Sequence, residues 1–278
     1  MTRVFAGARS APEDTGNQPS GSAGISRGGA TWLVLAVATV GLASLSAQTQ
    51  TIPRTADGKP NLSGIWQAVN SAVWDIQDHS AANGAPAGQG VVEGNELPYL
   101  PTAMAKRKEN LQNRLTRDTE RDCLLPGVPR ITYMPFPFQI VQTPKEVALL
   151  YEYAHAARHV YMDTPHLADG ITWWMGDSRG RWEGDTLVVD VNNFNDKTWF
   201  DRSGNFHSDA LHVIERYTLI DKDHIYYEAT IEDPKVFSRP WKMSMPLYRR
   251  IDKSMQLLDY ECYAFDDYVD HGNGPGRN

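Results

Sequence analysis

The second half of this chain is a succession of short segments in which hydrophobic and polar residues alternate. In residues 241–250, for example, Trp241, Met243, Met245 and Leu247 occupy every second position. This period of two is that of a β-strand with one buried face. Short turns rather than helices separate these segments, so the pattern excludes a βαβ architecture.

About ten strands are expected on this criterion. They cover residues 64–67, 138–143, 146–155, 158–163, 179–182, 186–192, 211–220, 225–233, 241–250 and 255–265. A continuous meander leaves exposed edge strands unless the sheet closes on itself. We therefore expect an all-β fold, an antiparallel meander closed into a β-barrel.

One region before the main strands has helical character. Residues 98–122 are rich in helix formers, and Met104, Leu111 and Leu115 recur at helical spacing, which predicts a helical segment at about 101–120. The preceding residues 77–97 are rich in Gly, Ala and Asn, a composition typical of a flexible loop.

The N-terminal residues predict a secretory signal peptide. An apolar run at 31–43 is followed by small residues up to Ala47. The run is shorter than the roughly 20 residues that a membrane-spanning helix needs, which argues against the alternative of a membrane anchor. We expect cleavage near Ala47, a single domain at 48–278 without a stable membrane span, and a location in the periplasm or cell envelope of a bacterium. An oxidising compartment permits a disulfide between Cys123 and Cys262, the alternative being two buried thiols.

Charge and missing motifs exclude several functions. The formal net charge is −7, without the basic surface that nonspecific nucleic-acid binding requires. The chain also lacks a Gly-x-Ser-x-Gly elbow, a phosphate-binding Gly loop, a dinucleotide fingerprint and a covalent haem motif. No cofactor is therefore clearly implied.

Two resemblances bear on the fold. Gly64-x-Trp66 in the first expected strand resembles the first-strand motif of lipocalin-like (calycin) barrels. In those barrels the Trp closes one end and an Arg from a late strand packs over it, a role that the resemblance assigns to Arg249 or Arg250.

The second resemblance covers most of residues 61–265. It rests on Cys123-Leu-Leu-Pro-Gly-x-Pro-Arg, Pro137-Phe-Gln-Ile-Val-Gln, Trp182-Glu-Gly-Asp-Thr-Leu-Val-Val-Asp and His207-Ser-x-Ala-Leu-His-Val-x-Glu-Arg. These phrases are similar to a large group of exported bacterial proteins of uncharacterised function. The resemblance implies export and a lipocalin-like β fold, and it assigns no catalytic residue.

A candidate binding site lies in the loops on either side of the hairpin at 180–191. Loops carry function more often than strands do, and aromatic walls are how barrels hold flat or hydrophobic ligands. The expected ligand-binding residues are Trp173, Trp174, Asp177, Arg179, Trp199 and Asp201, together with Tyr153 and Tyr161 on strands. The leading hypothesis is a small hydrophobic or aromatic ligand held in the barrel cavity.

An enzyme on the same scaffold is the main alternative. His207, Asp209, His212 and Glu215 are candidates for acid–base catalysis by an isomerase, lyase or hydrolase, because a carboxylate raises the basicity of a paired histidine. A single divalent metal could bind His155, His159, His207 and His212, although their spacing matches no standard motif. A structural protein of the envelope, without a ligand, is the third hypothesis.

Overall fold

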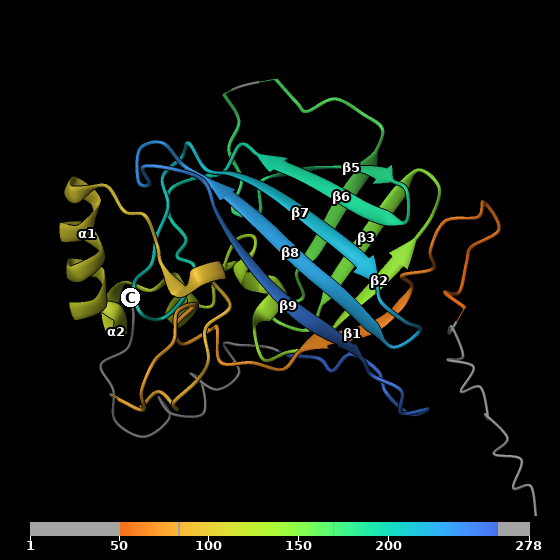
Figure 1. Cartoon of the computed structure of the whole chain (residues 1–278), viewed down its shortest axis with the longest axis horizontal. Helices are drawn as coiled ribbons and strands as arrows, with labels where there is room; N and C mark the ends of the chain where they lie inside the picture. Colours follow the sequence, from red (N-terminus) through yellow and green to blue (C-terminus); the bar gives the residue numbers. More distant parts are fainter. Residues whose placement is uncertain (1–50, 83, 169, 261–278) are drawn as a thin grey trace, which may run out of the picture. The chain divides into compact units, whose positions relative to one another are not determined.

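The computed structural model describes residues 51–82, 84–168 and 170–260 of the 278-residue chain. The chain divides into two units, 1–47 and 48–278, and every described residue belongs to the second. Within it, nine strands form one closed barrel and follow each other around it in sequence order (Figure 1). The predicted all-β barrel is thus confirmed, and its closure is consistent with a calycin-like fold.

Nine of the ten expected strands are present. They are β1 (Gly64–Ala68), β2 (Phe138–Gln142), β3 (Glu146–Tyr151), β4 (Ala157–Met162), β5 (Asp177–Glu183), β6 (Thr186–Asn192), β7 (His212–Leu219), β8 (His224–Glu232) and β9 (Trp241–Arg249). The strand expected at 255–265 is wrong over its described part, where Tyr260 makes a single bridge to Tyr153. Residues 261–265 lie outside the described residues.

The meander is not antiparallel throughout, because β4 and β5 pair in parallel. Segment 163–176 carries the chain back along the barrel before β5 begins, so both strands run in the same direction. Gly180 permits this pairing to be close, since a Cβ there would lie 2.5 Å from the sulfur of Met162. The other neighbouring pairs, including β9 with β1, are antiparallel.

Trp66 of β1 is packed against a residue from the last strand. Its side chain is fully buried, and its indole N–H donates to the carbonyl of Leu62 at 2.8 Å. The guanidinium of Arg249 lies over the Trp66 ring at 4.1 Å and donates to the carbonyl of Ser63 at 2.7 Å. The packing of a late-strand Arg on this Trp is therefore confirmed, and the residue is Arg249.

The barrel interior contains a buried ion pair. Arg158 on β4 and Glu215 on β7 are 3% and 0% exposed, and Arg158 Nη1 donates to Glu215 Oε1 at 3.2 Å. The hydroxyls of Tyr217 and Tyr227 donate to the same oxygen at 3.0 and 2.8 Å, and Ser178 Oγ accepts from Arg158 Nε at 2.9 Å. Burying two charges is tolerated because their hydrogen-bonding capacity is satisfied.

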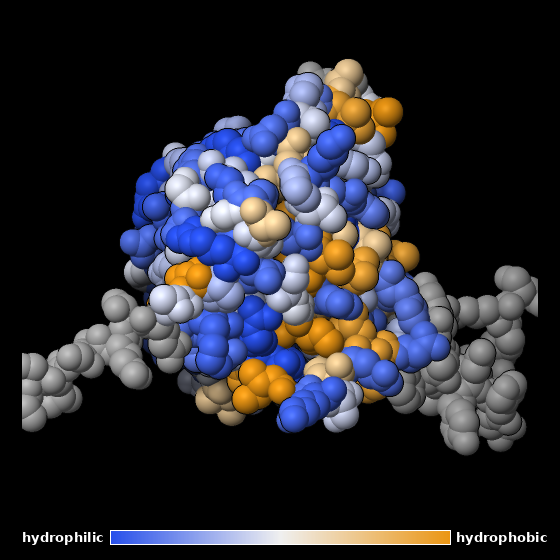
Figure 2. Space-filling view, turned by 90° about the vertical axis from the view of Figure 1, so that its right-hand side faces the viewer, coloured by the Kyte–Doolittle hydropathy of each residue, from blue (hydrophilic) through white to orange (hydrophobic). Residues whose placement is uncertain are grey.

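Helical residues lie beyond one end of the barrel, at the left of Figure 1. They form α1 (Pro101–Gln112), α2 (Arg114–Arg117) and the 3₁₀ turn η2 (Thr119–Asp122), which confirms the expected helical segment. Two further 3₁₀ turns are η1 (Glu93–Asn95) and η3 (Arg130–Tyr133). Among the described residues, no helix has the length and apolar character required to cross a membrane. The face turned away from α1 mixes hydrophilic and hydrophobic residues (Figure 2).

Candidate functional site

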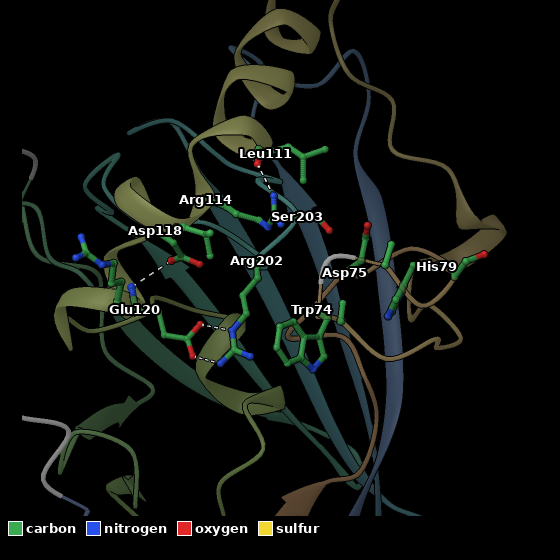
Figure 3. A pocket seen from close by; sticks show the side chains of 14 residues that line it. Trp74, Asp75, His79, Leu111, Arg114, Asp118, Glu120, Arg202 and Ser203 are labelled. Carbon is green, nitrogen blue, oxygen red and sulfur yellow. Dashed lines mark hydrogen bonds and ion pairs between the residues drawn. The ribbon is translucent and has the colours of Figure 1, made fainter. Parts of the chain in front are cut away.

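A pocket of about 590 Å³ lies outside the barrel, beside the helical segment (Figure 3). Three stretches of the chain line it. Residues 74–85 contribute one wall, residues 111–121 of α1, α2 and η2 contribute a second, and Arg202 and Ser203 complete it. This volume falls within the range of about 300–1,000 Å³ that is usual for small-molecule sites.

The floor of the pocket is an aromatic ring held by a charged side chain. The guanidinium of Arg202 lies over Trp74 at 4.2 Å, and its Nε donates to Glu120 Oε2 at 2.8 Å. Glu120 in turn accepts from Arg130 at 2.5 Å. Although burial alone would raise it, the hydrogen bond from Arg202 and the charge of Arg130 lower the pKa of the Glu120 carboxyl.

Arg130 holds Glu120 and Asp118 of this part of the chain in place. It is fully buried and donates from Nη1 and Nη2 to the two oxygens of Asp118, each at 2.8 Å. Bidentate pairs of this kind fix orientation as well as charge. The series Trp74–Arg202–Glu120–Arg130–Asp118 therefore fixes the pocket floor to η2, and we call it the pocket ion-pair chain.

The opposite side of the pocket is apolar. Leu111 and Leu115 of the helical segment line it together with Ala82 and Ala85. Leu115 is 74% exposed at the pocket rim. A large hydrophobic side chain left open to water beside a cavity is the kind of surface that ligands cover.

His79 also lines the pocket. Its Nδ1 lies 2.8 Å from the carbonyl of Gln77 and therefore carries the proton, which leaves Nε2 as an acceptor. Nε2 is buried and has no hydrogen-bond partner within the described part of the chain. A ligand with a hydroxyl or N–H group could satisfy it.

Asp201, an expected ligand-binding residue, lies behind the pocket and does not line it. It is fully buried and accepts hydrogen bonds from the backbone N–H groups of Ile76, Ser203 and Asn205 at 2.9–3.1 Å. Burial and the nearby charge of Asp75 raise the pKa of Asp201 to about 7. Asp201 thus ties the loop that carries Arg202 to the stretch that carries Trp74.

Other expected residues meet on the outer face of the barrel. There a row of polar side chains crosses β5 to β8, and we call it the outer strip. It consists of Asp177, Arg179, Asp190, His212 and Glu232, with His166 from segment 163–176. Sequence reasoning found three of these residues, Asp177, Arg179 and His212, as separate candidates.

Asp190 is the centre of the outer strip. Its Oδ1 lies 2.8 Å from His212 Nε2 and 3.1 Å from His166 Nε2, while His166 Nδ1 lies 3.0 Å from Asp177 Oδ2. The hydrogen bond to Asp190 raises the pKa of His212, and that of Asp190 is correspondingly lowered. His212 and Asp190 are 33% and 29% exposed, so this part of the strip is open to solvent, whereas Asp177 is buried.

The four catalytic candidates are not brought together. His212 and Glu215 point to opposite faces of β7, because their positions differ by an odd number. Asp209 forms an exposed ion pair with Lys235 at 2.6 Å. His207 is buried, with Nδ1 donating to the carbonyl of Ser208 at 2.9 Å and Nε2 accepting from Thr198 at 2.6 Å. Burial lowers the pKa of His207.

The four histidines suggested as metal ligands also have separate partners. His155 lies 3.3 Å from Asp259, and His159 pairs with Glu146. His207 and His212 have the contacts given above. The part of the chain that the structure describes contains no group of three or more His, Cys, Asp or Glu side chains placed to hold a metal ion.

The expected aromatic residues lie away from the pocket. Trp174 packs under Lys197 at 5.7 Å, Trp199 is 8% exposed, and Trp173 pairs by its backbone with Phe194. Tyr153 is buried and stacks on Tyr260, while Tyr161 is half exposed beside Arg179 of the outer strip. The Cys123–Cys262 disulfide stays a prediction, because Cys262 lies outside the described residues.

No protein-family model matches this chain, and a comparison with curated proteins finds no match either. A functional assignment therefore has to come from the residues of the two sites themselves.

Sequence reasoning missed the pocket. The sequence analysis assigned Trp74 to no element, His79 to the expected loop at 77–97, and Arg114 and Arg121 to the helical region at 98–122, with a binding role for none of them. A usable signal was present at Leu111 and Leu115, which lie on one helix face within a strongly charged segment. His166 of the outer strip gave no such signal, since only its contacts across the sheet distinguish it.

Proposed function

We propose that this domain binds a small hydrophobic or aromatic molecule in the pocket between Trp74 and the helical segment. The expectation from the sequence puts such a ligand inside the barrel. The inward-facing positions there are occupied by buried side chains, including the Arg158–Glu215 pair, so the proposal moves the ligand to the external pocket.

One observation carries this proposal, namely that Trp74 and the exposed Leu115 line the same hollow. Trp74 is held by the pocket ion-pair chain and does not have to be ordered when a ligand binds. A preorganised aromatic wall lowers the entropy lost on binding and so favours affinity.

Export is part of the same proposal. Residues 1–47 would be removed as a signal peptide, and the domain would act in the periplasm or cell envelope. Cys123 and Cys262 would then form a disulfide, which peptide mapping without reductant detects as a linked pair. Labelling of both cysteines by iodoacetamide in the denatured, unreduced protein would contradict it.

The test of binding uses a variant that fills the pocket. Ala82 is exposed and lines the hollow, so Ala82→Trp puts an indole into it without disturbing the barrel core. Ala81→Trp is the matched control, because Ala81 is equally exposed and does not line the pocket. Ligand-observed NMR against a panel of small aromatic molecules should give binders that wild type and Ala81→Trp retain and Ala82→Trp loses. Equal binding to Ala82→Trp, or no binder to wild type, would refute the proposal.

A catalytic role for the outer strip is the second candidate. It is supported by His212, which bonds Asp190 at 2.8 Å while remaining partly exposed, as a general base must. A screen of ester, lactone and epoxide substrates between pH 5 and 9 tests this candidate. It requires turnover that His212→Gln loses and His224→Gln keeps, since His224 pairs with Asp221 in a turn. Absence of turnover, or turnover that His212→Gln retains, rejects it.

A further inference from the structure

Two guanidinium groups in the pocket have no carboxylate partner among the described residues. Arg114 donates from Nη1 to the carbonyl of Leu111 at 3.1 Å, a bond that leaves most of its donors available. Arg121, seven residues further on in η2, is exposed, and its side chain makes no contact of this kind within the described residues. Both side chains line the pocket.

The carboxylates that line the pocket are already compensated. Asp118 binds Arg130, and Glu120 binds both Arg130 and Arg202. Asp75 lies 3.9 Å from Arg107. The uncompensated charge of the hollow is therefore positive, in a chain whose formal net charge is −7.

We infer that the natural ligand is an apolar carboxylic acid, whose carboxylate binds Arg114 and Arg121 and whose hydrophobic body lies against Trp74 and Leu115. This inference rests on the proposed function and specifies the chemistry of its ligand. Guanidinium groups bind carboxylates through paired, charge-assisted hydrogen bonds, which are stronger than neutral ones.

The surroundings favour a singly charged acid over a phosphate ester. Asp75, Asp118 and Glu120 lie in the same walls as the two arginines. Because Arg130 and Arg202 are already bound to Asp118 and Glu120, a second negative charge on the ligand would find no unpaired cation beyond Arg114 and Arg121. The remaining lining is apolar, which suits a ligand with one charged end.

The experiment compares three probes that share one ring system, 2-naphthoate, 2-naphthamide and 2-naphthyl phosphate. Isothermal titration should show that the acid binds wild-type protein about tenfold more tightly than the amide, the advantage of one charge-assisted pair. Arg121→Gln should remove most of that advantage while leaving amide affinity unchanged. Arg114→Gln, checked for helix content by circular dichroism, should act in the same direction.

Arg117→Gln is the matched control, since Arg117 lies on the same helical segment but pairs with Glu109 and does not line the pocket. It should retain the preference for the acid. Equal affinities for acid and amide, both abolished by Ala82→Trp, would overturn this inference and leave the proposed function intact. Tighter binding of the phosphate would also overturn it. If none of the three probes competes with the ligands whose binding Ala82→Trp abolishes, the inference of an apolar acid is overturned. If no such ligand is found at all, the proposed function itself is rejected.

Discussion

The guanidinium of Arg202 lies 4.2 Å above the ring of Trp74 and also donates to Glu120. One side chain thus joins three segments that are distant in sequence, the 71–85 stretch, η2 and the loop that follows Trp199. A partly desolvated cation–π contact contributes about 0.5–2 kcal/mol. The pocket consequently depends on an interaction between loops, while the barrel supplies the scaffold.

The first prediction concerns this contact. Arg202→Gln removes the stacking and the bond to Glu120, and we expect the free energy of unfolding to fall by about 1–3 kcal/mol. Arg202→Lys keeps the charge but lacks the planar guanidinium, so we expect an intermediate decrease in the free energy of unfolding. Urea denaturation measures both. Arg239→Gln is the control, because Arg239 is exposed and bonds only a neighbouring carbonyl at 3.4 Å; an equal loss in the control would contradict this role.

The second prediction concerns the ion pair inside the barrel. Glu215→Gln leaves Arg158 buried without its counter-charge, which should lower the free energy of unfolding by about 3–5 kcal/mol. Glu183→Gln breaks exposed pairs with Arg181 and Arg216, which solvent screens, and should change it far less. Urea denaturation measures both variants. If they lose the same free energy of unfolding, the Arg158–Glu215 pair is not shielded from water as the structure indicates.

The third prediction is a pH dependence in the outer strip. The pKa of His212 is raised in the folded protein. Its stabilising contribution is therefore fully present below its ordinary pKa of about 6.5, and it is lost as the pH rises through the pKa of the folded state. The lowered pKa of Asp190 makes its contribution present above about 3.9 and lost at lower pH. The ion pair should therefore stabilise most between about pH 4 and 6.5.

Urea denaturation at pH 5.5 and pH 9 checks this. The stability difference between wild type and His212→Gln should be larger at pH 5.5, and Asp190→Asn should reduce that difference in a double-mutant cycle. Glu232 and His166 also face this pair, so a remnant of the pH dependence should survive in the cycle. A difference that grows towards pH 9 would have the wrong sign for this account.

The fourth prediction concerns the close approach of Gly64 and Arg249. A Cβ at Gly64 would lie 2.0 Å from Arg249 Nη1, and Gly64 has φ near +143°, so Gly64→Ala should be strongly destabilising. Arg249→Ala removes the clash together with the packing on Trp66. Gly64→Ala should therefore cost less stability in the Arg249→Ala background than in wild type, with only the backbone strain remaining. Strict additivity in thermal unfolding would show that Arg249 does not explain the glycine.

Much of the barrel could be predicted because strand alternation is a local property. Trp241, Met243, Met245 and Leu247, which their spacing predicts to share one face, form the buried side of β9. The parallel pairing of β4 with β5 could not be predicted, since the direction of β5 depends on the path of the chain between the two strands. The Gly64-x-Trp66 resemblance predicted a contact of Trp66 with Arg249 or Arg250, far away in sequence, that no local pattern contains, and the structure shows it with Arg249.

The pocket and the outer strip were harder to predict from the sequence, because both depend on contacts between distant segments. Asp177, Arg179 and His212 could be recognised individually, but their convergence on Asp190 and His166 depends on strand register. Glu215 looked like a partner of His212 because they are close in sequence, and the alternation of the strand separates them. The pocket requires three loops and helices to meet, and Trp74 has no sequence context that marks it.

The most direct measurement for the central claim is the crystal structure of the protein with 2-naphthoate at saturating concentration. The account predicts the naphthalene ring against Trp74 and Leu115, with the carboxylate within hydrogen-bond distance of Arg114 and Arg121. A ligand inside the barrel or on the outer strip, or no bound ligand at all, would contradict it.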